Sequence, residues 1–390
     1  MPKINSNLLK LKKDYFFNEI EKKVLLKKQR KEKILNLGVG DITQPLAPIV
    51  VEAMKKAADE MKEEKTLKGY GPSSGYAFLK QKILDNDYKN FYFEIDEIFI
   101  SSGMKYSLAN ISDLFSRNSK VGILDPAYPL YTDANIINGR KQNISYLPLL
   151  EENNFEPLLP DEKLDIIYLC SPNNPTGQVF SKKTLKNWVD YAKKNNSLII
   201  FDGAYEAFIS SKDSVKSIYE ITGAKDVAIE MRSFSKKAGF TSLRCSYLVI
   251  PKNIKTLDNL SINSLWNRYI DTKFGGISYL IQKAAEATYS DPGKAQINSI
   301  ISTYMQNTKT LLFGLKKLNY TVYGGIDSPY VWCKCPKNVK SMDFFDKLLE
   351  KNICAIPGIG FGSSGEGFVR FSGFASSEII AEALLNLGTL

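Results

Sequence analysis

Hydrophobic and polar residues alternate along most of the chain with two different periods. Short, nearly continuous apolar runs are separated by longer stretches in which apolar residues recur every three or four positions. Parallel strands are buried on both faces and read as continuous apolar runs, whereas a helix that covers a sheet needs only one apolar stripe. The alternation therefore predicts an α/β fold with a mainly parallel sheet. The predicted strands span residues 97–101, 121–125, 165–170, 198–202, 227–231 and 246–250.

The two ends of the chain follow a different pattern. A helix is predicted around residues 17–25, and a short strand then leads into the glycine loop 36–41. Late in the chain, a long apolar stripe over 296–318 predicts a helix, and apolar runs at 330–333 and 368–371 predict strands. This mixture indicates a second, smaller α+β domain. We predict an N-terminal arm with part of the small domain (1–45), a large domain (46–285) and a small C-terminal domain (286–390).

The composition is that of a globular protein. Of the 390 residues, 44% are hydrophobic and 24% are charged, and no apolar run approaches the roughly 18 residues that span a bilayer. The formal net charge is +10, but the lysines are scattered rather than gathered on one face, as nucleic-acid binding would need. The first residues lack the apolar core of an export signal. We expect a cytoplasmic protein that binds neither nucleic acid nor membrane.

Two residue types limit the possible chemistry. Histidine is absent, which excludes Ser-His-Asp and Cys-His catalysis and any metal site with histidine ligands. The five cysteines are odd in number and lack the paired Cys-x-x-Cys spacing of zinc sites. We therefore expect reduced, mostly buried thiols and no metal.

The most informative stretch spans residues 233–244. It has Ser-x-Ser-Lys at 233–236, and Arg244 lies eight residues beyond Lys236. A lysine amine can form a Schiff base with an aldehyde, and hydroxyls beside a guanidinium can hold a dianion. Pyridoxal 5′-phosphate (PLP) carries both an aldehyde and a phosphate. An exposed basic turn would give the same local pattern, so the interpretation depends on the residues that accompany this stretch.

Residues with distinctive chemistry follow several of the predicted strands. Ligands of an open parallel sheet bind beyond the carboxyl ends of its strands. The N–H groups of a helix start suit a phosphate, and a rigid proline- and glycine-rich loop can hold an amide in place. A carboxylate that ends an apolar strand needs a cationic partner, such as a protonated pyridine nitrogen. The residues are Gly103, Met104 and Lys105 after the first strand, Tyr128 after the second, Asn174 after the third, and Asp202 with Tyr205 after the fourth.

Four separated motifs together resemble those of the class I and II aminotransferases, which are PLP enzymes of fold type I. They are Asn-Pro-Thr-Gly (174–177), Asp-x-x-Tyr (202–205), Ser-x-Ser-Lys (233–236) and Arg244. Within that superfamily, the chain is most similar to LL-diaminopimelate aminotransferases at residues 36–45, 69–72, 105 and 357–362. The resemblance implies a mainly parallel seven-stranded sheet between helices, a smaller α+β domain and a homodimer with the active site at its interface. It also implies amino transfer between an L-amino acid and a 2-oxo acid, with 2-oxoglutarate as the expected acceptor.

The resemblance implies roles for the residues around the cofactor. Lys236 would bind the PLP aldehyde and then shuttle a proton, while Asp202 would keep the pyridine nitrogen protonated. Asn174 and Tyr205 would bind the ring 3′-oxygen, and the ring of Tyr128 would stack on the cofactor. The phosphate would be held by Gly103, Met104, Lys105, Ser233, Ser235 and Arg244, with Tyr70 reaching it from the second subunit.

The substrate is expected on the open side of the cofactor. Arg370 would bind the substrate α-carboxylate, because a planar guanidinium matches a carboxylate with two parallel hydrogen bonds. Tyr15 and Gly40 would border the substrate. Lys105, Tyr128 and Asn174 are expected to face both the substrate and the cofactor.

Two positions depart from the diaminopimelate pattern. Those enzymes usually carry an acidic residue where this chain has Ser73, and an Asn in the segment that here reads Phe274-Gly275-Gly276. Both changes remove groups that would recognise the distal end of diaminopimelate. The amino donor therefore stays open among diaminopimelate and aromatic, lysine-like or glutamate donors.

Parts of the sequence are also compatible with three functions other than aminotransfer. Residues 360–365 match the Gly-x-Gly-x-x-Gly dinucleotide fingerprint, but a strand rather than a helix is predicted to follow, which disfavours a dehydrogenase. A transcription regulator would need a separate DNA-binding segment, and only about 35 residues precede the first glycine loop. A PLP-dependent lyase would use nearly the same cofactor residues and stays an alternative.

Overall fold

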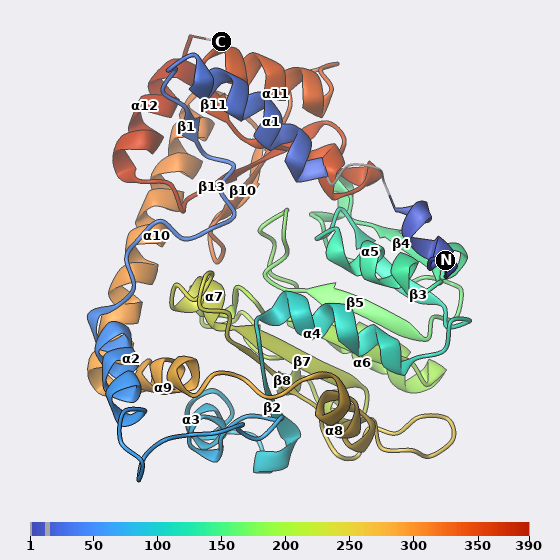
Figure 1. Cartoon of the computed structure of the whole chain (residues 1–390). Helices are drawn as coiled ribbons and strands as arrows, with labels where there is room; N and C mark the ends of the chain where they lie inside the picture. The colour runs from blue at the N-terminus through green and yellow to red at the C-terminus, as the bar shows by residue number, and fades with distance from the viewer. Residues whose placement is uncertain (1, 12–15, 390) are drawn as a thin grey trace.

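A seven-stranded sheet forms the larger part of the computed structural model, which describes residues 2–11 and 16–389 (Figure 1). The strand order is β2-β8-β7-β6-β5-β3-β4. The neighbours β7, β6, β5, β3 and β4 pair in parallel, whereas β8 is antiparallel to both β7 and β2. The strands are β2 (Ile98–Ser101), β3 (Val121–Asp125), β4 (Ile144–Pro148), β5 (Ile166–Cys170), β6 (Leu198–Asp202), β7 (Ala228–Ser233) and β8 (Ser246–Val249).

The mainly parallel sheet predicted from the apolar runs is confirmed, and the six predicted runs all form strands of it. The strand β4 has no counterpart among the predictions. It lies at the edge of the sheet, where Leu147 is its one buried residue and Tyr146 is 52% exposed. A strand with little burial shows no continuous apolar run, so the hydrophobic pattern does not reveal it.

Helices surround the sheet and connect it to a second body (Figure 1). Figure 1 shows α4 crossing in front of the sheet and the long α10 rising from α9 toward the second body, which contains α1, α11 and α12. The α-helices are α1 (Phe16–Gln29), α2 (Pro48–Glu60), α3 (Ala77–Asp87), α4 (Met104–Ile111), α5 (Leu130–Ile137), α6 (Lys182–Asn195), α7 (Phe234–Lys237), α8 (Ile262–Lys273), α9 (Tyr279–Ala287), α10 (Asp291–Lys317), α11 (Ser341–Glu350) and α12 (Ser377–Leu387).

The second body is built from both ends of the chain. Its antiparallel sheet has the order β12-β13-β10-β9, and a separate parallel pair joins β1 to β11. Leu35 and Leu37 share a buried cluster with Phe344 and Phe371, so the N-terminal segment belongs to the core of this body. The two boundaries between the three predicted segments, at 45/46 and 285/286, stay a prediction. The strands are β1 (Leu35–Asn36), β9 (Val322–Gly324), β10 (Tyr330–Lys334), β11 (Ile353–Cys354), β12 (Ile356–Pro357) and β13 (Phe368–Ser372).

Two further sequence expectations can be compared with the structure. All five cysteines are buried and free, as predicted. Within residues 2–11 and 16–389, no helix has the length and apolar character that crossing a membrane requires.

Ile200 offers a test of the sheet core, because it lies in the middle of the central strand β6 and is fully buried. Replacing Ile200 with Ala removes apolar contacts and leaves a cavity, so we expect a loss of about 2–5 kcal/mol in the free energy of unfolding. Chemical unfolding followed by circular dichroism measures the loss. The control Ile326→Ala, at a position that is 70% exposed, should change it by less than about 0.5 kcal/mol. Equal losses at both positions would contradict this assignment of the core.

Candidate active site

A cavity of about 1190 Å³ opens at the carboxyl ends of the parallel strands, beneath residues of the second body. Cys170, Asp202 and Ser233 contribute the ends of β5, β6 and β7 to its wall, and Arg370 of β13 lines the same cavity. The end of a parallel sheet is where such folds bind ligands. The cavity brings together most residues singled out from the sequence: Gly40, Met104, Lys105, Tyr128, Asn174, Asp202, Tyr205, Ser233, Ser235, Lys236, Arg244 and Arg370.

Two of the predicted site residues do not line this cavity, and a third is not among the described residues. Gly103 lies beside the cavity, where an added Cβ would come within 2.2 Å of Arg244 Nη2. Tyr70 is fully exposed and, with Gly275, borders a separate hollow of about 490 Å³. Tyr15 lies outside the described residues.

Lys236 is the amine of the cavity. It is on the one-turn helix α7 that directly follows β7, and its Nζ donates a hydrogen bond to the carbonyl oxygen of Gly40. Burial lowers the pKa of the Lys236 ammonium from 10.5 to about 8; Asp41 opposes this shift, while Arg370 and Arg244 add to it. An amine with this pKa is available in its neutral, nucleophilic form close to physiological pH.

Asp202 provides a carboxylate at the end of the central strand β6, where it is 5% exposed. Tyr131 Oη donates to Asp202 Oδ2 at 2.7 Å, and the Ala204 N–H donates to Oδ1 at 2.9 Å. Burial raises the pKa of the Asp202 carboxyl above its ordinary value, and these two hydrogen bonds oppose the rise. A cation that enters the cavity beside Asp202 would relieve the cost of burying this charge.

Tyr131 is a site residue that the sequence analysis missed. It lies in the first turn of α5, is buried, and stacks on Tyr168 with ring centroids 5.2 Å apart. In the sequence, Tyr131 cannot be told apart from the other buried residues on the apolar face of α5. The available signal was its position three residues after Tyr128, which places both rings near the start of the same helix.

An anion cradle lies on the Arg244 side of the cavity. Arg244 adopts a left-handed backbone conformation with φ of 61°, and its Nη1 donates to the carbonyl oxygen of Thr241 at 2.9 Å and to Ser235 Oγ at 3.5 Å. Gly103, the residue before α4, leaves the space that the Arg244 guanidinium occupies. Together with Ser233, these groups offer hydroxyls, a guanidinium and the N–H groups of a helix start, which suit a phosphate dianion.

Arg370 reaches the cavity from β13 and is 3% exposed. Its Nη1 donates to Asn174 Oδ1 at 2.7 Å and its Nη2 donates to the carbonyl oxygen of Gly38 at 3.1 Å. Its Nε has no hydrogen-bond partner among the described residues. A buried donor of this kind is costly to leave unpaired, and an entering carboxylate would satisfy it.

Tyr330 is a second residue that the sequence analysis did not assign to the site. The Arg370 guanidinium lies 4.1 Å from the centre of the Tyr330 ring, and the Tyr330 hydroxyl is 2.9 Å from the Tyr205 hydroxyl. Burial, followed by the neighbouring Tyr330, holds the pKa of Tyr205 well above its ordinary value. The Tyr205 hydroxyl therefore stays protonated and can donate a hydrogen bond.

These groups fit PLP. The amine of Lys236, with its lowered pKa, can bind the aldehyde of PLP. The buried Asp202 carboxylate can pair with the protonated pyridine nitrogen. The anion cradle matches its phosphate, and the unpaired Arg370 Nε matches a substrate carboxylate. The residue after the lysine, Lys237, is instead paired outside the cavity with Asp87 at 3.4 Å.

The Gly-x-Gly-x-x-Gly segment 360–365 does not open a helix. It forms two short 3₁₀ turns that lead into the strand β13. The sequence analysis predicted a strand directly after this segment, and that prediction is confirmed. Asp125 binds the segment by accepting from Ser363 Oγ at 2.6 Å and from the Ser364 N–H at 3.1 Å. The strand-turn-helix context of a dinucleotide fingerprint is therefore missing here.

Comparison with known proteins agrees with this geometry. The pattern of the family "Aminotransferase class I and II" matches residues 32–384. The chain is 48% identical over 405 residues to a curated LL-diaminopimelate aminotransferase of Agathobacter rectalis, covering 100% of both chains. It is also 48% identical to one of Parabacteroides distasonis, covering 99% of both. The solved structure of the Chlamydomonas reinhardtii LL-diaminopimelate aminotransferase, at 38% identity, superposes with a TM-score of 0.94 over 99% of this chain and 98% of that one.

The low pKa of Lys236 can be tested on the ligand-free protein. Lys236 should be half neutral near pH 8, because burial disfavours its ammonium form, whereas the pKa of Lys237 is raised by its carboxylate neighbours. Competitive acetylation followed by peptide mass spectrometry gives the pH dependence of each amine. We expect Lys236 to react with a midpoint near pH 8 and Lys237 to stay protected. A midpoint at the ordinary lysine value of 10.5 for Lys236 would contradict the site described here.

The Tyr131 hydrogen bond to Asp202 generates a second prediction. Tyr131→Phe removes a donor to a buried carboxylate, and hydrogen bonds to charged groups contribute about 1.5–3 kcal/mol, which corresponds to roughly ten- to hundredfold in turnover. The Asp202 pKa should rise further, so activity should be lost most at low pH. Steady-state kcat measured across pH tests this. The control is Tyr168→Phe, because the Tyr168 hydroxyl bonds Asn135 instead; similar activity in both variants would show that the Tyr131 contact is unimportant.

Proposed function

As a member of the class I and II aminotransferases, the chain is a PLP-dependent enzyme that moves an amino group between an amino acid and a 2-oxo acid, and we propose that its amino donor is LL-diaminopimelate. The full-length 48% identity to two curated LL-diaminopimelate aminotransferases is the observation that supports this donor. We propose 2-oxoglutarate as the acceptor. The five buried free thiols support a reducing compartment, so we also propose that the enzyme works in the cytoplasm.

The proposed roles of the cofactor-binding residues follow from the cavity. When bound, PLP supplies an electron sink that stabilises negative charge at the donor Cα. Lys236 Nζ, whose pKa burial lowers to about 8, takes the proton from that Cα and returns it during amino transfer. The Asp202 carboxylate keeps a proton on the ring nitrogen, and Tyr131 keeps the carboxylate ionised. Tyr205 and Asn174 orient the ring through its 3′-oxygen, and Tyr128 stacks on the ring.

The remaining residues position the cofactor phosphate and the substrate. Arg244, with Gly103, Met104, Lys105, Ser233 and Ser235, holds the phosphate in the anion cradle. Arg370 forms a fork for the donor α-carboxylate, in which its Nε gains the partner that it lacks. Gly40 borders the donor because its carbonyl lies against Lys236, and we include Tyr15 on the strength of the resemblance.

We propose that the enzyme is a homodimer whose second subunit completes the cavity. The fully exposed Tyr70 supports this, because an unpaired aromatic ring of this size is commonly covered by a partner. Tyr70 then reaches the phosphate of the other subunit. Ser73 and Gly275, close to Tyr70 in sequence or space, favour a second candidate function: a donor without a distal ammonium group, such as glutamate or an aromatic amino acid.

A panel of amino donors tests the proposed specificity. The purified PLP-loaded enzyme is mixed with LL-diaminopimelate, glutamate, lysine and aromatic amino acids, and the spectral change from the pyridoxal to the pyridoxamine form of the cofactor is followed by stopped flow. We expect the apparent second-order rate constant of this conversion to be highest for LL-diaminopimelate. The control is Lys236→Ala, which removes the proton-transferring amine and should slow every donor by at least about 10²–10⁴-fold.

Each outcome of the panel assigns a donor class. Faster conversion by glutamate or an aromatic amino acid than by LL-diaminopimelate would overturn the proposed donor and support the second candidate. Retained conversion in Lys236→Ala would overturn the role of Lys236 itself.

A further inference from the structure

A cluster of buried charges lies next to the cavity but does not line it. We call Asp87, Glu206, Glu230, Arg232 and Lys237 the buried charge cluster. Their side chains are between 0% and 21% exposed. They come from the end of α3, the 3₁₀ helix η6 (Glu206–Phe208), the strand β7 and the helix α7. None of them belongs to the groups assigned to PLP or to the substrate.

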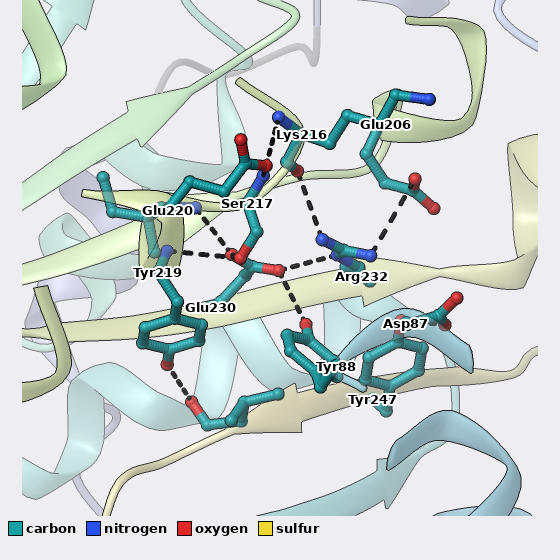
Figure 2. A network of polar contacts seen from close by, with 12 residues as sticks. Asp87, Tyr88, Glu206, Lys216, Ser217, Tyr219, Glu220, Glu230, Arg232 and Tyr247 are labelled. Atoms are coloured by element: carbon teal, nitrogen blue, oxygen red, sulfur yellow. Dashed lines mark hydrogen bonds and ion pairs between the residues drawn. The ribbon is translucent and has the colours of Figure 1, made fainter. Parts of the chain in front are cut away.

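The charges form one connected chain of ion pairs, part of which Figure 2 shows. Glu230 Oε1 accepts from Arg232 Nε at 2.6 Å, and Arg232 Nη1 lies 3.9 Å from Glu206 Oε2. Glu206 Oε1 lies 3.7 Å from Lys237 Nζ, which in turn lies 3.4 Å from Asp87 Oδ1. Lys237 thus stands between two carboxylates, one on α3 and one on η6.

Hydroxyl groups complete the cluster. Asp87 Oδ2 accepts from the hydroxyls of Tyr247 at 2.7 Å and Tyr289 at 2.6 Å. Burial alone would raise the pKa of Asp87, but Lys237 and Arg232 hold it below its ordinary value. Glu230 accepts from the Tyr88 hydroxyl at 2.6 Å and from Ser217 Oγ at 2.7 Å. The Asp87 carboxylate therefore stays ionised beside Lys237 at neutral pH.

The position of this cluster in the sequence connects it to the catalytic groups. Glu206 directly follows Tyr205, and Lys237 directly follows Lys236. In both pairs the first residue lines the cavity and the second belongs to the cluster. The Glu206–Lys237 ion pair therefore joins the two segments that present Tyr205 and Lys236, and it does so outside the cavity lining.

Stability alone explains this arrangement poorly. Removing charges from water costs several kcal/mol for each ion, and a buried ion pair is often no more stabilising than apolar residues of the same volume. Buried pairs do, however, restrict the geometry of the segments that carry them, because each charge has few low-energy positions. The segment that needs such restriction is α7, whose single turn spans only Phe234–Lys237.

We propose that Glu206 and Lys237 are positioning residues, whose ion pair fixes the Lys236 amine relative to Tyr205 during amino transfer. Lys237 is held at its other side by Asp87, which anchors α7 to the end of α3. The role depends on PLP-dependent amino transfer and not on which donor the enzyme uses. Displacements of about 1 Å at a reacting group can slow catalysis by up to about 10²-fold.

The experiment uses the PLP-loaded enzyme and the variants Lys237→Met, Glu206→Gln and Lys237→Arg. We expect kcat to fall by about tenfold in Lys237→Met and in Glu206→Gln with little change in KM, because the amine is misplaced while the substrate fork is intact. Lys237→Arg keeps a cation at position 237, so this variant should retain most of the activity of the unmodified enzyme. The double variant Lys237→Met/Glu206→Gln should lose no more than the worse single variant, since both remove the same contact.

A readout without any donor separates this proposal from the proposed function. The visible absorption of the lysine-bound cofactor changes with pH, and its midpoint reports the surroundings of Lys236. The midpoint should move to higher pH in Lys237→Met, which loses a nearby cation, and to lower pH in Glu206→Gln, which loses an anion. The charged groups facing Lys236 inside the cavity, Asp41, Arg244 and Arg370, are unchanged in these variants.

The control breaks an ion pair that is far from α7. Lys193→Met removes the exposed 3.1 Å pair with Asp226 and should leave both kcat and the absorption midpoint as in the unmodified enzyme. Thermal unfolding of all variants reports stability separately. If Lys237→Met and Glu206→Gln only lower the unfolding temperature, with kcat and midpoint unchanged, the cluster is merely structural and the proposal is wrong. Equal losses of activity in Lys237→Arg and Lys237→Met would also overturn it.

Discussion

The buried carboxylate of Asp202 is the constraint on which the site depends. It ends β6, the fourth strand of seven, and is only 5% exposed. A charge in such a place needs hydrogen bonds and an opposite charge to stay ionised. Tyr131 and the Ala204 N–H supply the hydrogen bonds, and in the proposed function the pyridinium nitrogen of PLP would supply the charge. The neighbouring strand β7 then places the amine and the anion cradle within reach of the same small molecule, because adjacent strands lie only about 4.8 Å apart.

Much of this arrangement is encoded locally and could be predicted. The residues Tyr128, Asn174, Asp202 and Ser233 each stand at or just after an apolar run, and parallel strands end at one edge of a sheet. Recognising the strands was therefore sufficient to gather these side chains around one cavity, without any knowledge of how the helices pack. The glycine at position 103 is a further local signal, since its missing side chain leaves room for Arg244.

What the sequence did not reveal are contacts between distant segments. The Tyr205–Tyr330 hydroxyl pair joins residues 125 positions apart, and the Lys236–Gly40 contact joins residues 196 apart. The neighbouring sequence does not reveal that Tyr330 contacts Tyr205 or that Gly40 contacts Lys236. A tyrosine on a buried strand and a glycine in a loop both have ordinary structural explanations. Tyr131 was hidden in the apolar stripe of its helix. The edge strand β4 was hidden for the opposite reason, since its residues are too exposed to form an apolar run.

The N-terminal glycine loop has a mechanical consequence. Its Gly38 carbonyl is bonded to the guanidinium of Arg370, its Gly40 carbonyl is bonded to the amine of Lys236, and β1 ties the loop to β11 of the second body. The loop thus joins the guanidinium of Arg370 to the amine of Lys236. Because β1 and Arg370 both belong to the second body, a shift of that body relative to the sheet would move the loop with Arg370 and change the contact between Gly40 and Lys236. Capture of a carboxylate and release of the amine from its resting contact would then be two parts of one motion.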